Sequence, residues 1–536
     1  MSDDRTPPRT TTLEGAGFVA CLAVFLGLAG WYFTAVGTGV VDDAFIPLRY
    51  ADRLVHGEGL TYTPGPPVEG YTSLLWTLLL AAGHLLPLEP LQLARGAGIA
   101  LSVGTLVAVW RAARLLVPGP TALVAVALVA LNRSLALWSV EAMDTSLFTC
   151  CLAFALWAWL RHGSRLVRGL PLTGLAFGLL VLARPEGVLF AALAGLFGGL
   201  AAWRSGTLRR FAVHAATTTL FLAAHTAFRL LEYGDVVPNT FHAKVQGAQL
   251  GRGLGYLLLW ARENVLVLPA ALAVAGALHL HRTSDRRAEL LWLETSLLAY
   301  LAYVALVGGD YFEFRLLVPT LPLAALLAAA GVEAVRRRIP RPHAGAATAA
   351  ALTATLLAGS VWAIAEPHRN DPQCIRPDDP SELAELRWFE RSARWLACNI
   401  DPRETLAVRP AGVIPYLTGA GALDMLGLND RAIARRGTRV ADAAVGHQRV
   451  ASPEDVRARG ATYLVGHPVR SDRPIHDPAL VSAEVSPGEW LILMPLRADA
   501  VLPPGAYPLG ASSTVLEGWR PRTSGGRCVP YNPANP

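Results

Sequence analysis

The sequence predicts an all-α polytopic membrane bundle followed by a soluble α/β domain. Of the 536 residues, 53% are hydrophobic and only 16% are charged, whereas an ordinary soluble domain carries about 25% charged residues. The apolar residues gather in runs of roughly 20, the length that crosses a bilayer as a helix. Many of the arginines before residue 366 lie in short clusters between those runs, as they do in the cytoplasmic loops of membrane proteins.

The apolar runs and the basic loops between them predict the topology of the bundle. The runs cover residues 15–37, 71–87, 91–110, 119–138, 145–160, 170–183, 186–203, 210–231, 257–280, 289–307, 312–333 and 343–365. Four basic loops share one side, since two runs separate each from the next: 161–168, 204–210, 282–287 and 336–341. The positive-inside rule makes that side cytoplasmic. Counted from there, the run at 71–87 has to be re-entrant or interfacial. That leaves about eleven crossings, with the N-terminus inside and the C-terminus outside.

The chain divides into a short N-terminus, a membrane domain and a tail. We assign residues 1–14 to a cytoplasmic N-terminus and residues 15–365 to the transmembrane domain, whose first outer loop is 38–70. Residues 366–536 form an extracytoplasmic soluble domain in this assignment. This tail is richer in Pro, Asp and Arg, and its apolar runs shrink to the length of strands.

The tail contains both strand and helix patterns. Predicted strands lie at 405–408, 422–426, 462–465 and 490–494, and a helix is predicted at 381–396 with Ser381 as its N-cap. The tail also contains Cys374, Cys398 and Cys528. A Cys374–Cys528 bridge and three unpaired thiols both fit the sequence.

Several classes of function leave no signature in this chain. The net charge of +6 is scattered over the basic loops, and no basic face with interleaved aromatic residues predicts a nucleic-acid partner. There is no P-loop, H-E-x-x-H or G-x-S-x-G motif. The acidic loops do not form a compact oxygen cage, so no cofactor is predicted with certainty and a divalent metal stays open.

Charged residues near membrane depth are costly and mark candidate sites. In this chain they gather in the predicted outer loops, in six clusters: Asp42 and Asp43; Glu69 and Tyr71; Glu141 and Asp144; Arg184 and Glu186; Asn239, His242 and Lys244; and Asp310 and Arg315. Acids lie toward one end of the chain and cations toward the other. This distribution predicts a cavity that takes a phosphate-bearing ligand and carries out acid–base chemistry beside it.

Structural explanations for these residues stay open. A helix beginning at Asp43 and lying along the membrane surface would use an acid at its N-terminus. Asp144 is a plausible N-cap, and Arg184 and Glu186 can form a local ion pair. Lys244 and Arg315 can simply extend to the membrane interface.

The clusters in this order resemble the GT-C class of glycosyltransferases. Within that class the match is to the terminal β-arabinofuranosyltransferase family of mycobacterial cell-wall synthesis. The residues that carry it are Asp42-Asp43-Ala44-Phe45-Ile46, Glu69-Gly70-Tyr71-Thr72-Ser73, Arg184-Pro185-Glu186-Gly187, Pro238-Asn239-Thr240-Phe241-His242-Ala243-Lys244, Gly308-Gly309-Asp310, Asp424-Met425-Leu426-Gly427-Leu428-Asn429-Asp430 and Gly446-His447-Gln448-Arg449. Asp144 departs from the pattern, because relatives usually carry Glu there.

The resemblance implies a membrane glycosyltransferase of the bacterial inner membrane. Its donor would be a polyprenyl-phosphate sugar, with arabinofuranose or another pentose as the sugar, and its acceptor an extracytoplasmic glycan or glycolipid. A first-loop carboxylate would be catalytic. We take Asp43 as the general base, with Asp42 orienting it or sharing the proton, and we expect an inverting displacement.

The remaining cluster residues are predicted to surround that carboxylate. We assign donor-phosphate binding to Lys244, Arg184, Arg315, His242 and Asn239, and other roles in the site to Glu69, Tyr71, Glu141, Asp144, Glu186 and Asp310. The alternative is a non-enzymatic lipid-binding or transport protein, or a component of an envelope or motility complex.

Overall fold

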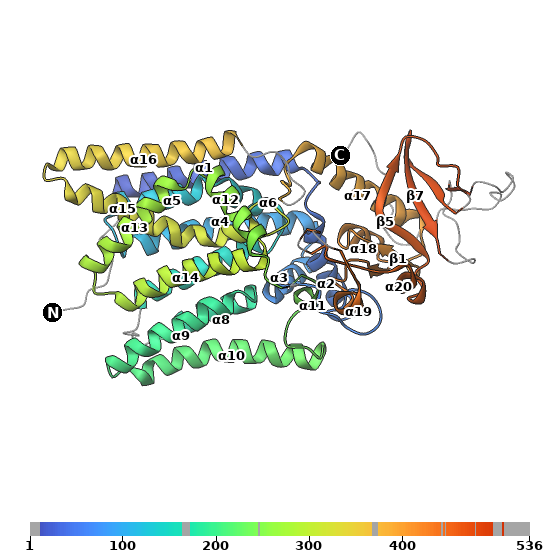
Figure 1. The fold of residues 1–536 in the computed structure, drawn as a ribbon, viewed down its shortest axis with the longest axis horizontal. Helices are drawn as coiled ribbons and strands as arrows, with labels where there is room; N and C mark the ends of the chain where they lie inside the picture. Colours follow the sequence, from blue (N-terminus) through green and yellow to red (C-terminus); the bar gives the residue numbers. More distant parts are fainter. Residues whose placement is uncertain are drawn as a thin grey trace.

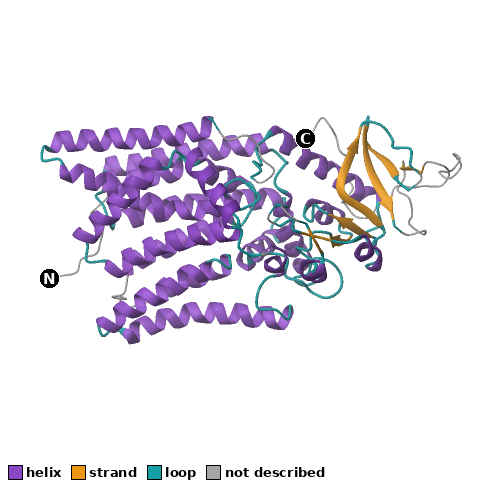
Figure 2. Ribbon diagram, viewed as in Figure 1, coloured by secondary structure: helices purple, strands orange, loops and turns teal. Residues whose placement is uncertain are grey.

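A computed structural model describes residues 11–162, 172–244, 247–366, 374–440, 443–444, 446–477, 479–496 and 506–508. Long helices run side by side in a bundle, and a mixed domain of strands and short helices follows at one end of it (Figures 1 and 2). The predicted fold class, a polytopic helical bundle with a C-terminal α/β domain, is therefore confirmed.

The bundle and its outer loops contain sixteen α-helices and two 3₁₀ turns in the described residues. Their bounds are α1 Thr12–Val36, η1 Asp42–Ala44, α2 Phe45–Val55, α3 Leu74–His84, α4 Pro90–Ala113, α5 Gly119–Ala130, α6 Arg133–Val140, α7 Thr145–His162, α8 Leu172–Ala183, α9 Gly187–Arg204, α10 Leu208–Glu232, α11 Asn239–Lys244, α12 Leu250–Glu263, α13 Val267–Thr283, α14 Arg287–Val307, η2 Arg315–Thr320, α15 Leu321–Arg338 and α16 Pro342–Ala365.

Local signals explain where several helices begin. Thr11 and Glu14 form a reciprocal capping box at the start of α1, which satisfies two otherwise unpaired donors. The Glu89 carboxylate accepts from the first turn of α4, and Asn132 caps α6. These acceptors stand where apolar runs begin, so the sequence pattern and the helix starts agree.

Judged by length and composition, fewer helices qualify as membrane spans than the predicted eleven. Within the described ranges, seven helices are long and apolar enough to cross a membrane, or up to nine if the bent pairs α5–α6 and α12–α13 each form one span. The other two predicted crossings are α7, which ends in Arg161 and His162, and α8, which has only 12 residues. Neither has the apolar length of a full span.

The basic loops that the structure describes lie at one end of the bundle. The turns between α9 and α10, between α13 and α14, and between α15 and α16 are all at the end away from the C-terminal domain (Figure 1). The 161–168 loop falls mostly outside the described residues. The three described loops therefore share a side, as predicted, and the C-terminal domain is on the other.

Two short helices, α2 and α3, form a layer between the bundle and the C-terminal domain (Figure 1). At about 1.5 Å per residue, the 11 residues of α3 reach roughly 16 Å, about half the hydrocarbon core. This agrees with the prediction that 71–87 does not cross. The expected surface helix from Asp43 is corrected: Asp42–Ala44 form a 3₁₀ turn and α2 starts at Phe45.

The environment of α2 also differs from the expected membrane surface. Arg49 of this helix is buried and donates to the carbonyls of Tyr62, Pro415 and Ala420. The contacts to Pro415 and Ala420 show that the C-terminal domain covers this part of α2. The Arg49 side chain can be buried there because each of its three nitrogens donates to a carbonyl.

The C-terminal domain is built on a six-stranded sheet. Strand order is β2-β1-β5-β7-β6-β8, with β1 parallel to β2 and β5 and the remaining pairs antiparallel. The elements are α17 Pro380–Asn399, β1 Thr405–Val408, α18 Val413–Thr418, β2 Gly421–Asp424, α19 Arg431–Arg436, β3 Thr438–Arg439, β4 Arg449–Val450, α20 Pro453–Ala458, β5 Tyr463–Ser471, β6 Val481–Ser486, β7 Glu489–Pro495 and β8 Ala506–Pro508.

Two predictions for the tail need correction or stay open. The N-cap of α17 is Asp379, not Ser381, because Pro380 takes the first helical position and the Asp379 carboxylate accepts from the Ser381 amide at 2.9 Å. The four predicted strands correspond to β1, β2, β5 and β7. Cys528 lies outside the described residues, so the Cys374–Cys528 alternative stays a prediction.

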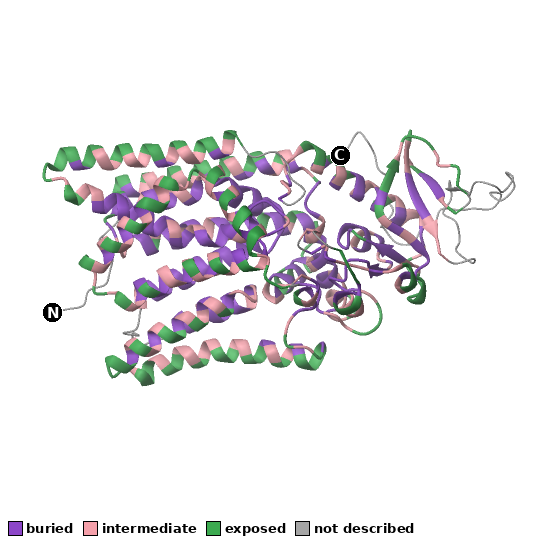
Figure 3. Cartoon of the chain, viewed as in Figure 1, coloured by how far each residue is buried: buried purple, intermediate pink, exposed green. Residues whose placement is uncertain are grey.

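Burial is concentrated where the bundle meets the C-terminal domain, whereas the outer helices α10 and α16 expose most of their residues (Figure 3). Exposed apolar faces of this kind are what lipid covers. A buried ion network joins the two parts: Arg133 pairs with Glu313 at 2.5 Å and with Asp378 at 2.7 Å. The bundle and the domain therefore share one interior.

Candidate functional site

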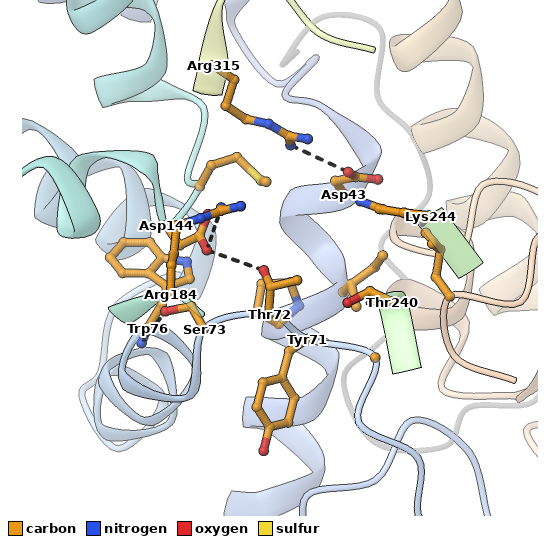
Figure 4. A pocket seen from close by; sticks show the side chains of 15 residues that line it. Asp43, Tyr71, Thr72, Ser73, Trp76, Asp144, Arg184, Thr240, Lys244 and Arg315 are labelled. Atoms are coloured by element: carbon orange, nitrogen blue, oxygen red, sulfur yellow. Dashed lines mark hydrogen bonds and ion pairs between the residues drawn. The ribbon is translucent and has the colours of Figure 1, made fainter. Parts of the chain in front are cut away.

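A cavity of about 550 Å³, including the space at its open mouth, lies where the bundle, the α2–α3 layer and the C-terminal domain meet. It is lined by Asp43, Ile46, Pro47, Gly70, Tyr71, Thr72, Ser73, Trp76, Met143, Asp144, Arg184, Thr240, Lys244, Arg315 and Leu428. Segments far apart in the chain therefore converge on one cavity, and six of the predicted site residues line it (Figure 4).

Asp43 is a partly accessible carboxylate in this cavity. Its side chain is 27% exposed, and Oδ2 lies 3.5 Å from Nη1 of Arg315 (Figure 4). Asp310 orients this arginine, accepting from Nε at 2.8 Å and from Nη2 at 3.0 Å. A forked guanidinium held on one edge by a carboxylate presents its remaining nitrogen in a fixed direction, here toward Asp43.

Asp42 lies beside Asp43 in sequence but not in the cavity lining. Its carboxylate oxygens accept from the amides of Gly412 and Val413, both at 2.8 Å. Burial raises the pKa of Asp42 to about 7, although these two hydrogen bonds act in the opposite direction. The predicted pair is thus divided: Asp43 faces the cavity and Asp42 binds the C-terminal domain.

Arg184 lines the cavity with its charge compensated on both sides. Nη1 donates to the Asp144 carboxylate at 2.9 and 3.0 Å, while Nε and Nη2 donate to Glu186 at 3.2 and 3.0 Å. Thr72 also donates to Asp144 at 3.4 Å (Figure 4). The local Arg184–Glu186 pair considered from the sequence is present, and Asp144 extends it. This cluster leaves little cationic charge for a bound anion.

Lys244 is the cavity cation without such compensation. It lies at the end of α11, and its side-chain carbons pass Gly446 of the C-terminal domain. Among the described residues it makes no ion pair. An ammonium on the wall of a cavity is a point charge suited to phosphate, so Lys244 is the better placed of the predicted phosphate-binding cations.

Besides Asp42, Glu186 and Asp310, four more predicted residues lie outside the cavity lining, where they hold the surrounding loops. His242 contacts Asp235 at 3.0 Å. The Asn239 amide donates to the carbonyls of Gly427 and Leu428 at 2.8 and 2.9 Å. Glu69 pairs with Arg229 at 2.8 Å, and Glu141 accepts from the Val41 amide at 2.9 Å; burial raises their pKa values to about 7 and about 8.

Tyr71 is one of the residues that line the cavity, but its hydroxyl is bonded elsewhere. The hydroxyl lies 3.0 Å from that of Tyr233, and the ring points away from the charged groups (Figure 4). Its packing edge-on against Tyr50 gives a ring-centroid distance of 5.0 Å. The structure therefore places Tyr71 as a wall and support of the site.

Sequence reasoning missed several lining residues, including Trp76, Met143, Thr240 and Leu428. Thr240 and Leu428 lie inside the motifs quoted above, but apolar and hydroxyl side chains in a motif carry no charge signal. The sequence does contain a signal for Arg229, which lies in the last turn of the apolar helix α10. An arginine at that depth needs an acidic partner, and Glu69 is that partner. No group of three or more His, Cys, Asp or Glu suited to a metal occurs among the described residues.

Comparisons with known proteins match both parts of the chain. Residues 73–228 match the family described as dolichyl-phosphate-mannose-protein mannosyltransferase, and residues 380–515 match a domain of unknown function (DUF8728). A terminal β-(1→2)-arabinofuranosyltransferase of Mycobacterium tuberculosis is 28% identical over 354 residues. That match covers 59% of this chain and 55% of the relative, so the chain spans about half the length of that protein.

Solved structures of two membrane-protein relatives in fold, ArnT and AglB, share the arrangement of elements of this chain. ArnT from Cupriavidus metallidurans in the apo state gives a TM-score of 0.55 at 14% identity, covering 90% of this chain and 98% of that one. The same protein bound to undecaprenyl phosphate gives 0.51 at 14% identity, covering 76% and 85%. The Archaeoglobus fulgidus oligosaccharyltransferase AglB with an inhibitory peptide and a dolichol-phosphate gives 0.54 at 12% identity, covering 84% and 69%.

These likenesses establish the fold. The chain has the GT-C fold of membrane glycosyltransferases, and the resemblance to the terminal arabinofuranosyltransferase seen in its motifs is confirmed.

Proposed function

We propose that this GT-C chain is a membrane glycosyltransferase that moves arabinofuranose or another pentose from a polyprenyl-phosphate donor to an extracytoplasmic glycan or glycolipid. The mycobacterial relative is by name an arabinofuranosyltransferase, and the ArnT and AglB structures contain polyprenyl or dolichyl phosphates. A fold alone does not define an activity. The proposal therefore rests on the cavity, which combines an accessible carboxylate with an ammonium that makes no ion pair to the described residues.

Asp43 acts as the general base in this proposal. Its carboxylate takes the proton of the acceptor hydroxyl while that oxygen bonds to the anomeric carbon of the donor. The bond between the anomeric carbon and the phosphate oxygen breaks in the same displacement, which inverts the configuration. The leaving group carries its electron pair away as a polyprenyl phosphate, a weak base that needs no strong general acid.

Cations in the cavity stabilise the charge that develops on that phosphate. Lys244 is the first choice, because Arg184 and Arg315 already share their charge with carboxylates. Donors aimed at developing charge in a site that excludes water are worth more than in bulk solvent. Arg315 has a second role here, since Nη1 lies 3.5 Å from Oδ2 of Asp43 and holds that carboxylate in the cavity.

The single observation that carries the proposal is the accessible Asp43 carboxylate in the cavity, and replacing it tests the proposal. Purified Asp43→Asn should lose about a hundred-fold or more in transfer of labelled pentose from polyprenyl phosphate to a glycan acceptor, with donor affinity retained. Asp52→Asn is the matched control, since Asp52 is on α2, outside the cavity, and contacts His56.

Two results would overturn the proposal. Wild-type turnover in Asp43→Asn would remove Asp43 as the base. Specific donor binding by the wild-type protein without any transfer would instead favour the lipid-binding alternative.

A further inference from the structure

The C-terminal domain contributes a wall to the cavity of the bundle. Among the described residues of that domain, only Leu428 is in the lining, which also includes the apolar residues Ile46 and Pro47. We infer that Leu428 determines which sugar the site accepts, by limiting its size. This inference rests on the proposed function and gives the C-terminal domain a part in donor selection.

Leu428 lies in a loop, Asp424–Asp430, that a single buried carboxylate holds together. Oδ1 of Asp424 accepts from the amides of Leu426 and Gly427 at 2.9 and 3.2 Å. Oδ2 accepts from the amide and the side-chain nitrogen of Asn429 at 2.7 and 3.0 Å. Four hydrogen bonds to one carboxylate leave the loop few other conformations.

The bundle holds the same loop from the opposite side. The side-chain amide of Asn239 donates to the carbonyls of both Gly427 and Leu428. The Tyr50 hydroxyl donates to Oδ1 of Asn429 at 3.2 Å. Asn429 also lies directly over Gly70, where a Cβ atom would be 1.7 Å from its Oδ1. The backbone on both sides of Leu428 is therefore fixed to the bundle.

A side chain on a fixed backbone limits the size of the sugar that the cavity can accept. A hexose carries one carbon and one hydroxyl more than a pentose, and a closely fitting apolar pocket separates substrates that differ by one methylene by roughly 10–200-fold. Because Leu428 presents a branched side chain on a fixed backbone, shortening that side chain opens the cavity without releasing the loop.

The test compares donors with variants of the full-length protein. Leu428→Ala should raise the ratio of kcat/KM for a polyprenyl-phosphate hexose over the corresponding pentose by roughly ten-fold or more. Leu428→Phe should lower kcat/KM for the pentose, because it fills the cavity. Leu426→Ala is the matched control: Leu426 is in the same loop and buried, but does not line the cavity.

The outcomes separate this inference from the proposed function. If the wild-type protein transfers no sugar, both fail together. If it transfers pentose and Leu428→Ala gives the same hexose-to-pentose ratio as Leu426→Ala, only the inference fails. Thermal unfolding of each variant shows whether it is folded; if Leu428→Ala does not fold, Leu428→Phe decides, and pentose kinetics equal to those of the wild type then overturn the inference.

Discussion

At the scale of single residues, the two adjacent acids have different environments. Consecutive residues of the 3₁₀ turn Asp42–Ala44 project in different directions, so Asp43 faces the cavity while Asp42 meets the amides of Gly412 and Val413. The pair was identifiable from sequence as costly charge beside a membrane. Its division was not, because the partners of Asp42 are some 370 residues away in the chain.

The buried Asp42 carboxyl makes stability depend on pH. Burial raises the pKa of Asp42 from 3.8 to about 7, so between these values the folded protein keeps a proton that the unfolded chain releases. Stability is therefore lost as the pH rises through this window, by at most about 1.4 kcal/mol per pH unit from this group. Asp42→Asn has no such proton, and its unfolding midpoint should fall less than that of the wild type between pH 5 and 7. Parallel midpoints over this range, followed by circular dichroism, would contradict the prediction.

At the scale of elements, hydrophobic runs predicted the long helices and the four strands β1, β2, β5 and β7. The four residues of β1 match the prediction, but β5 continues beyond Val465 to Ser471, because after an irregularity it pairs with β7. The strands β6 and β8 were not predicted. The six residues of β6 mix apolar and polar side chains, and β8 has only three residues. Their extended form depends on partners in the sheet, which a local pattern does not contain.

The close contact between the loop before α3 and the C-terminal domain gives an element-level prediction. Gly70→Ala should destabilise the protein by about 1–3 kcal/mol, as overpacking does, because the new Cβ meets Asn429 and the Tyr50 hydroxyl. The unfolding midpoint should drop in Gly70→Ala and not in Gly96→Ala, whose Cβ has open space on α4.

A double-mutant cycle isolates that contact. In an Asn429→Ala background, Gly70→Ala should cost less than in the wild type, because the obstructing side chain is gone. Equal costs in both backgrounds would show that the strain at Gly70 has another source.

At the scale of the whole molecule, the charge pattern predicted which loops share an end of the bundle. Counting runs between Arg clusters placed the tail opposite the basic loops, and the structure has that arrangement for the described loops. The contacts between the tail and the first outer loop were not predictable, since Arg49 and Tyr62 donate to backbone carbonyls of residues 411–420. Carbonyls are present at every residue and leave no mark in a sequence.

The proposed extracytoplasmic site predicts a labelling pattern. In a background without native cysteines, Glu58→Cys on the exposed part of the first loop should react with a membrane-impermeant maleimide in intact cells. Ser205→Cys, in the exposed turn between α9 and α10, should react only after permeabilisation. The reverse pattern would place Asp43 in the cytosol and exclude the chemistry proposed for it.

The two hydrogen bonds from the amides of Gly412 and Val413 to Asp42 can form only late in synthesis of the chain. Those partners are 370 and 371 residues downstream, which at about 5–20 residues per second of translation is a delay of roughly 20–70 s. During that interval the helices of the bundle are synthesised, and Asp42 in the first outer loop has no access to these two amides. A nascent or truncated chain therefore lacks the partners of Asp42, and we expect the proposed transfer activity only after the last domain has emerged and docked.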